Sequence, residues 1–231
     1  MKYDKQIIVA LDFSTKKACL DFLQNIDPER CRVKVGKELF TRSGPDLIRQ
    51  INLEGYDVFL DLKFHDIPNT VAGALKVAAD LGVWMVDVHA SGGKAMLDAS
   101  REALNYQQAP LLIAVTVLTS IGPEELSQIA VTNTPQQQVQ VLADLAVDSG
   151  LDGVVCSAQE TDFLRLQCPS DFKLVTPGIR PNGESVDDQK RVVIPRSALQ
   201  QGSDFLVIGR PITQASNPSE KLDSIIQDIE S

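Results

Sequence analysis

The chain has few of the residues that build metal sites and disulfides. It contains only two histidines, His65 and His89, and its four cysteines show no Cys-x-x-Cys spacing. This scarcity argues against a histidine-rich metal site, although carboxylates could still bind a hard cation. The cysteines are best interpreted as free, mostly buried thiols in a reducing cytoplasm.

Long apolar runs are also lacking. No run approaches the roughly 18 apolar residues that suggest a membrane-spanning helix. The first apolar segment, Ile7–Leu11, is too short for the apolar region of a secretion signal, and the segment has no small-residue cleavage site. We therefore expect a cytoplasmic protein with no membrane association.

Positive charge is in the minority. The 231 residues include 22 lysines and arginines and 31 aspartates and glutamates, which gives a net charge of −9. A nucleic-acid binder usually presents a basic face, so this balance argues against a nucleic-acid partner. No low-complexity segment, linker or change of composition divides the chain. We predict one domain over residues 1–231, long enough to bury a sizeable core.

Short apolar segments recur along the chain, with amphipathic segments between them at 15–25, 70–81 and 134–149. Most of the apolar segments are continuous, which is typical of parallel strands covered on both faces. Eight strands alternating with helices predict an α/β fold, a (β/α)8 TIM barrel. A doubly wound open sheet shows the same alternation, but no Gly-x-Gly-x-x-Gly turn follows the first strand. The predicted strands are Ile7–Leu11, Arg32–Val35, Val58–Leu62, Val83–Val88, Leu111–Leu118, Gly153–Cys156, Lys173–Thr176 and Phe205–Ile208.

Polar residues follow nearly every predicted strand, whereas the strand starts carry no comparable set. In a barrel, catalytic residues lie at the carboxyl ends of the strands, so this distribution predicts an active site there. We expect His89 to support the pocket by hydrogen bonding rather than to act as an acid or base. The strand-end residues are Asp12, Lys34, Asp61, Lys63, His89, Thr119, Ser120, Ser157, Arg180, Gly209 and Arg210.

The densest group of charges follows the third strand, where Asp61 and Lys63 are separated by one residue and Asp66 lies just beyond. Side chains alternate faces along a strand, so Asp61 and Lys63 project to the same side. Lys34 lies between two valines of the second strand, where a lysine is tolerated only if it is paired. We predict an alternating chain Lys34–Asp61–Lys63–Asp66, with Asp12 as a further partner of Lys34. Such neighbours would keep the lysines protonated and the aspartates ionised near neutral pH. A purely structural ion-pair network is the alternative.

The last two strands are followed by features of a phosphate site. In barrels, the loops after strands seven and eight often bind phosphate through backbone N–H groups. Gly209 and Arg210 end the eighth strand, and a guanidinium suits phosphate oxygens. The preceding loop, residues 178–190, is long and polar, as functional lids are. Arg180 and Gln189 are its residues best equipped to reach a phosphate or a carbonyl-bearing ring.

The segment Asp61-x-Lys63-x-x-Asp66-Ile-Pro-Asn-Thr70 resembles the signature of the orotidine 5′-phosphate decarboxylase family. Further segments match the bacterial branch of that family in order, over nearly the whole chain. Ile194 is a minor departure, because threonine is expected more often before Pro195. The further matches are Leu11-Asp12, Lys34-Val-Gly36, Val117-Leu-Thr-Ser120, Thr176-Pro-Gly-Ile-Arg180, Asp188-Gln-Lys-Arg191 and Val207-Ile-Gly-Arg-Pro-Ile212.

The resemblance implies a barrel enzyme that converts orotidine 5′-monophosphate to UMP and CO2, the last step of de novo pyrimidine biosynthesis. It implies a homodimer with active sites at the subunit interface, and neither a metal nor an organic cofactor. Lys63 would protonate C6 of the pyrimidine within an array completed by Lys34, Asp61 and Asp66. Asp66 and Thr70 would reach in from the partner subunit. The substrate would be bound by Asp12 and Lys34 at the ribose, by Thr119 and Ser120 near the pyrimidine, and by Arg180, Gln189, Gly209 and Arg210 at the phosphate.

Two other functions stay open at this point. A 3-keto-L-gulonate 6-phosphate decarboxylase or hexulose-phosphate synthase shares the barrel and an Asp-x-Lys-x-x-Asp pattern, but uses Mg²⁺. Those enzymes are not expected to carry the lid pattern around Gln189. A non-catalytic nucleotide-binding barrel is the second alternative, although a pure binder gains nothing from an aspartate aimed at an anionic ligand.

Overall fold

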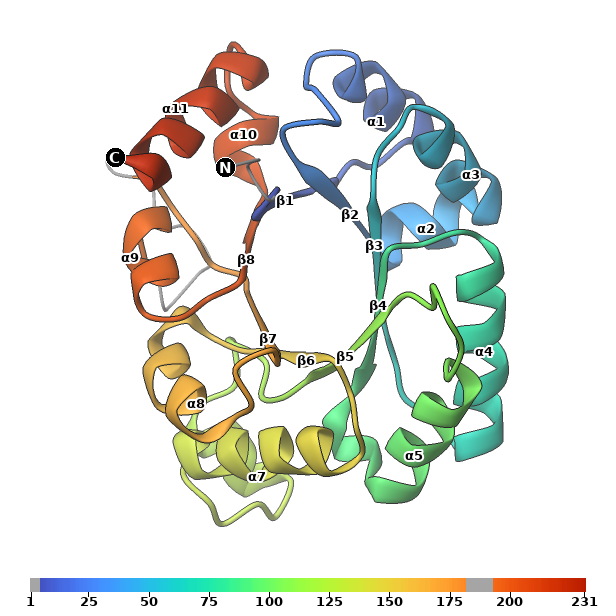
Figure 1. The fold of residues 1–231 in the computed structure, drawn as a ribbon, viewed down its shortest axis with the longest axis vertical. Coiled ribbons are helices and arrows are strands. Elements are labelled where there is room, and N and C mark those ends of the chain that lie inside the picture. The colour runs from blue at the N-terminus through green and yellow to red at the C-terminus, as the bar shows by residue number, and fades with distance from the viewer. Residues whose placement is uncertain (1–4, 182–192) are drawn as a thin grey trace.

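Eight parallel strands close into one barrel in the computed structural model, which describes residues 5–181 and 193–231 (Figure 1). Each strand pairs with the next along the chain, and the first also pairs with the last. The predicted (β/α)8 barrel is therefore confirmed. The strands are β1 (Ile7–Ala10), β2 (Arg32–Gly36), β3 (Val58–Phe64), β4 (Met85–His89), β5 (Leu111–Val115), β6 (Gly153–Val155), β7 (Lys173–Thr176) and β8 (Phe205–Ile208).

Helices form an outer ring around the strands (Figure 1). Several have the end signals that the sequence carries: the Thr15 hydroxyl accepts a hydrogen bond from Ala18 N–H, and Thr134 and Gln137 cap each other's backbone. The helices are α1 (Lys16–Leu23), α2 (Lys37–Ser43), α3 (Pro45–Leu53), α4 (Pro68–Asp80), α5 (Lys94–Ala103), α6 (Pro123–Gln128), α7 (Pro135–Asp148), α8 (Thr161–Gln167), α9 (Pro195–Gln200), α10 (Arg210–Thr213) and α11 (Pro218–Glu230), with short 3₁₀ turns at Ala90–Gly92 and Ala158–Glu160.

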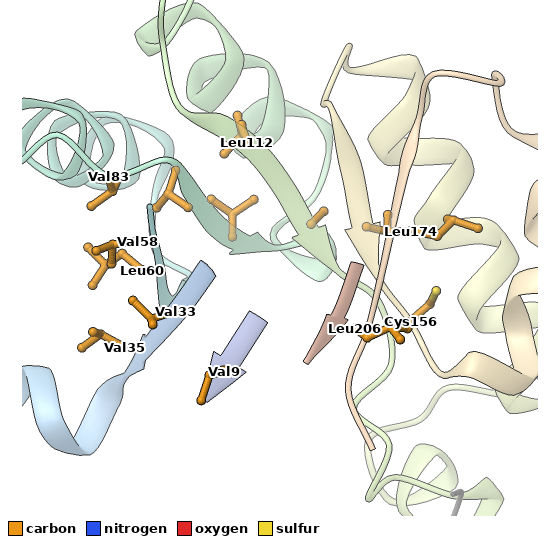
Figure 2. Close-up of a cluster of buried hydrophobic side chains, with 14 of the residues drawn as sticks. Val9, Val33, Val35, Val58, Leu60, Val83, Leu112, Cys156, Leu174 and Leu206 are labelled. Atoms are coloured by element: carbon orange, nitrogen blue, oxygen red, sulfur yellow. The ribbon is translucent and has the colours of Figure 1, made fainter. Parts of the chain in front are cut away.

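Two apolar clusters fill the molecule, because alternate strand residues face opposite sides of the sheet. The larger lies between the strands and the helices, and Figure 2 shows part of it, including Val33, Val35 and Leu60. The smaller fills the barrel interior with residues such as Phe59 and Met85. On β2 the two valines belong to the outer cluster, so Arg32 and Lys34 face the interior. The alternation thus places charged side chains inside the barrel, above and below an apolar layer.

Six of the predicted strands differ from the observed ones by at least one residue at an end: β1, β2 and β6 by one, β4 by two at its start and one at its end, and β3 and β5 as follows. The apolar run to Leu118 leaves the sheet after Val115, because β6 has only three residues and offers no partner beyond that point. Val117 and Leu118 instead line a cavity, so they are apolar because they form a cavity wall and not because they belong to a covered strand. The third strand runs beyond Leu62 to Phe64, with an irregular register against β4 between Leu60 and Phe64.

The four cysteines are buried and free, as predicted. Within residues 5–181 and 193–231, every helix is too short or too polar to span a lipid bilayer.

Candidate active site

Inward-facing charges meet at the carboxyl ends of β2 and β3. The Lys34 ammonium lies 3.1 Å from Asp61 Oδ2 and 3.5 Å from Asp12 Oδ1. The Lys63 ammonium contacts the other oxygen of Asp61. Of the predicted chain of charges, the structure thus brings together Lys34, Asp61 and Lys63, with Asp12 beside Lys34.

Burial and pairing act against each other on these groups. The side chains of Lys34 and Asp61 are each only 11% exposed. Burial by itself would raise the pKa of Asp61, but the charges of Lys34 and Lys63 lower it below its usual range. Burial would lower the pKa of Lys34, and the charges of Asp61 and Asp12 raise it above its usual value. Asp61 is therefore ionised and Lys34 protonated at neutral pH.

Asp66 does not join this array within one chain, which corrects the predicted chain of four charges. Its side chain is exposed and accepts a hydrogen bond from Ile67 N–H at 2.6 Å. Among the described residues it forms no ion pair. Asp66 lies two residues beyond the end of β3 at Phe64 and two before the start of α4 at Pro68, so it is outside the sheet that positions Asp61 and Lys63. Thr70, in the first turn of α4, is also exposed.

Asp87 on β4 takes the place that the sequence assigned to Asp66. Its side chain is fully buried, its Oδ1 accepts a hydrogen bond from the Lys63 backbone N–H at 2.7 Å, and its Oδ2 lies 3.8 Å from the Lys63 ammonium. Burial, and then the charge of Asp61, raise the pKa of Asp87 well above its usual value. The sequence analysis missed this residue. The sequence nevertheless carries a signal for Asp87. It lies between two valines of its strand, as Lys34 does on β2, and it projects to the same side of β4 as His89.

The backbone of Lys63 is strained. Only three non-glycine residues in the described chain have positive φ, and Lys63 is the one at the charged array. A left-handed conformation costs an L-residue about 1–2 kcal/mol. Strain of this kind clusters at functional sites when the surrounding contacts hold it in place. Here the side chain of Asp87 supplies such a contact.

A cavity of about 180 Å³ lies against the array. One side is formed by Lys34, Asp61 and Lys63, and the rest is mainly apolar. Thr119 lies in its wall, whereas Ser120 is exposed and is not part of the lining. A cavity that is charged on one side and apolar on the others suits a planar polar ring with one reacting edge. The apolar walls are Phe59, Val115, Val117, Leu118, Val155, Cys156, Pro177 and Val207.

A second cavity, of about 490 Å³, contains the predicted phosphate-binding arginines in its lining. Arg180 and Arg210 reach it from the ends of β7 and β8. Gly209 lies beside β1 and Asp12, since a Cβ added there would lie 3.5 Å from Ala10 Cβ and 3.7 Å from Asp12 Oδ2. Gln189 lies outside the described residues. Arg180, near the start of the predicted lid, donates its backbone N–H to the carbonyl of Val193, which lies three residues beyond the predicted end of the lid, at 3.1 Å.

His89 lies beside this site but is not a proton donor at neutral pH. Its ring centroid is 5.5 Å from that of His65, which is exposed. Burial, followed by the nearby charges of His65 and Lys63, lowers the pKa of His89 to about 4. The ring is therefore neutral near pH 7, and its supporting role stays a prediction.

The chain is similar to known proteins over nearly its whole length. A model described as the orotidine 5′-phosphate decarboxylase / HUMPS family matches residues 5–225. A protein of Saccharophagus degradans named orotidine 5′-phosphate decarboxylase is 56% identical over 223 residues, 96% of this chain and 94% of that protein. One of the same name from Chromobacterium violaceum is 58% identical, over 96% of this chain and 91% of that protein.

A solved structure agrees with these sequence relatives. The crystal structure of orotidine 5′-phosphate decarboxylase from Lactobacillus acidophilus matches with a TM-score of 0.89 at 39% identity, covering 99% of this chain and 100% of that one. The region matched by the family model includes all eight strands and every residue of the charged array.

Proposed function

The chain belongs to the orotidine 5′-phosphate decarboxylase / HUMPS family, and we propose that it decarboxylates orotidine 5′-monophosphate to UMP in pyrimidine biosynthesis. The family model spans two branches, but both curated relatives described above carry the decarboxylase name. The observation that carries the proposal is the position of Asp61, which lies between two ammonium groups at the edge of a largely apolar cavity.

The reaction explains why such an arrangement is useful. Loss of CO2 from C6 of the pyrimidine leaves an sp² carbanion that the ring π system cannot delocalise. Stabilisation must then come from charges placed in advance where negative charge develops. Lys63 faces the cavity beside Asp61 and is the group that would protonate C6.

Asp61 acts on the ground state in this proposal. Its carboxylate would lie against the substrate carboxylate, and two unit charges 4 Å apart near a protein surface interact by about 4 kcal/mol. That repulsion disappears as CO2 leaves. Lys34 holds Asp61 in place and keeps it ionised, because its charge lowers the pKa of Asp61.

Electrostatic repulsion supplies only part of the rate enhancement, since enhancements at the upper end of the usual range require about 23 kcal/mol. The remainder is assigned to phosphate binding, used to align the ring and close the lid. Arg180 and Arg210 line the larger cavity and would bind the phosphate, with Gln189 bridging to the base. Asp12, next to Lys34 and Gly209, would bind ribose hydroxyls.

We further propose that two chains form a homodimer in which Asp66 and Thr70 complete the partner's site. The exposure of Asp66, away from its own Lys63, supports this arrangement. So do two large apolar side chains exposed on the same segment, Ile67 (67%) and Val77 (60%). Each of these side chains would be removed from water if this segment packed against a partner chain.

The assay that tests the reaction follows the loss of absorbance as orotidine 5′-monophosphate becomes UMP. We expect turnover that EDTA does not change. Turnover abolished by EDTA and restored by Mg²⁺, or activity on 3-keto-L-gulonate 6-phosphate instead, would favour the other branch of the family. Binding of the nucleotide without turnover would favour a non-catalytic barrel.

A separate experiment tests the shared site. Lys63→Ala and Asp66→Ala subunits, each inactive alone, are mixed under conditions in which exchange is demonstrated. One site of each heterodimer then has both residues intact, so activity should return to about half of the wild-type value per heterodimer. Exchange without recovery would show that Asp66 acts within its own chain or not at all.

A further inference from the structure

Asp87 is a fully buried acid that the proposed mechanism does not use. It faces the barrel interior on β4, one layer above Met85. On other strands of the described structure, three ionisable groups interact with it electrostatically. These are Asp61 and Lys63 on β3, and Lys34 beyond them on β2. His89 lies two residues further along its own strand, and β5 brings the apolar Ile113 beside it.

The first oxygen of Asp87 replaces a backbone carbonyl as the acceptor of a hydrogen bond in the sheet. Its Oδ1 accepts the Lys63 N–H at 2.7 Å, at the point where the register between β3 and β4 is broken. A strand residue would normally donate this N–H to a backbone carbonyl of the neighbouring strand. The carboxyl of Asp87 therefore satisfies the one backbone donor that the left-handed turn at Lys63 removes from the ladder.

The second oxygen of Asp87 is buried without a donor. Among the described residues, no group donates a hydrogen bond to Oδ2, and the Lys63 ammonium at 3.8 Å is beyond hydrogen-bond distance. An ionised carboxylate would leave that oxygen unsatisfied in a buried site, which is unfavourable. A protonated oxygen would instead be a donor, and the Asp61 carboxylate, whose negative charge raises the pKa of Asp87, is the neighbouring acceptor. The raised pKa of Asp87 agrees with this protonation state.

We propose that Asp87 is a positioning residue that acts as a neutral acid, holding the Lys63 backbone in its left-handed turn and donating a hydrogen bond to Asp61. This inference rests on the proposed decarboxylation. Asp87 does not touch the cavity, so its effect passes through Lys63 and Asp61. In this arrangement the carboxylate of Asp61 is oriented from one side by Lys34 and from the other by Asp87.

The test compares two substitutions with a matched control. Asp87→Asn keeps an oxygen for the Lys63 N–H and an N–H donor for Asp61, but has no ionisable proton. Asp87→Leu keeps the size and removes both hydrogen bonds, and Asp87→Ala replaces it if the leucine variant does not fold. Met85→Leu changes a buried residue of the same strand and face without touching the array. For each variant, kcat and KM are measured with orotidine 5′-monophosphate, and folding is checked by UMP binding.

We expect Asp87→Asn and Met85→Leu to keep kcat within about threefold of the wild type. Asp87→Leu or Asp87→Ala should lose kcat by at least a hundredfold while KM changes less than tenfold, because phosphate binding is untouched. Loss of kcat in Asp87→Asn equal to that in Asp87→Leu would overturn the neutral acid, since it would show that a negative charge is required. Normal kcat in Asp87→Leu or Asp87→Ala would overturn the positioning role. A wild-type protein without decarboxylase activity would instead refute the proposed function.

Discussion

The two ends of the barrel interior use the same strand in different ways. Arg32 and Lys34 are two residues apart on β2 and both face inward, one at each end of the apolar layer. The guanidinium of Arg32 lies 4.2 Å from the centroid of the Trp84 ring and 5.2 Å from that of Phe205, and it donates to the Lys5 carbonyl. Lys34, at the other end, pairs with carboxylates beside a cavity.

The difference shows that a buried cation does not by itself mark a site. At the Arg32 end, the guanidinium packs against aromatic rings and pairs with Asp57, and both contacts stabilise the fold. Asp57 also forms an ion pair with Lys5. At the Lys34 end, three features occur together: a cavity, a strained backbone at Lys63, and two neighbouring aspartates whose pKa values are shifted in opposite directions. That combination is the reason for which we propose a catalytic role at the Lys34 end and a structural one at the Arg32 end.

The largest difference between the ends should come from removing one carboxylate at each. Asp61→Asn removes a repulsion of about 4 kcal/mol and should lower kcat by roughly 10³-fold. Asp57→Asn, the matched change at the other end, should leave kcat within twofold. Steady-state kinetics on both variants checks this. Equal losses would show that the charge of the whole barrel interior, rather than the array, supports the reaction.

Substitution of Arg210 tests whether the Lys34 end of the barrel, called the open end because the two cavities lie there, contains a phosphate subsite. Arg210→Ala should raise KM by about a hundredfold, because a charge-assisted hydrogen bond contributes roughly 1.5–3 kcal/mol. Binding of uridine, which has no phosphate, should change less than threefold when measured by calorimetry. A matching loss of uridine binding would show that Arg210 shapes the pocket instead.

The pH dependence of stability should separate Asp87 from an ordinary surface carboxyl. The folded protein raises the pKa of Asp87, so it keeps a proton that the unfolded chain releases above about pH 4. The stability that this group contributes is fully present below the unfolded pKa and is lost as pH rises toward the folded pKa.

Asp87→Asn removes this dependence. The free energy of unfolding of Asp87→Asn, relative to that of the wild type, should increase by up to about 1.4 kcal/mol per pH unit above pH 4. The increase should stop at the pKa that Asp87 has in the folded wild-type protein. Urea unfolding at pH 4, 6 and 8 measures the difference. A gap between the two proteins that stays constant across this range would contradict a neutral Asp87.

The smallest effect on activity is expected from a substitution at the Arg32 end of the barrel. Arg32→Met removes a cation–π contact and a carbonyl partner, which should lower the free energy of unfolding by about 1–2 kcal/mol. The value of kcat should stay within twofold of the wild type. A large loss of kcat without loss of stability would show that the two ends are coupled through β2.

Much of the site could be predicted from the sequence, because strand alternation and charge pairing are local rules. A lysine between valines on β2 and an Asp-x-Lys spacing on β3 were enough to place Lys34, Asp61 and Lys63 together. The same rule applied to Val86-Asp87-Val88 would have found Asp87.

Other features could not be predicted in this way. The positive φ at Lys63 occurs together with a hydrogen bond to Asp87 on β4, and no local pattern near Lys63 encodes that contact. The exposed position of Asp66 beyond the end of β3 likewise follows from where the strand ends. The apolar run from Leu111 to Leu118 predicts one strand, because the walls of a cavity and covered strands are both apolar. Only the short partner β6 shows where that strand ends.

The most direct test of the account is the turnover of Lys63→Ala measured beside its affinity for UMP. Proton transfer by a positioned side chain typically contributes 10²–10⁴-fold, and here the same ammonium also stabilises the carbanion. We therefore predict that decarboxylation falls at least 10⁴-fold, while calorimetry shows UMP bound within about tenfold of the wild-type affinity. Near-normal turnover by Lys63→Ala would contradict the claim that the charged array at the open end of the barrel performs the reaction.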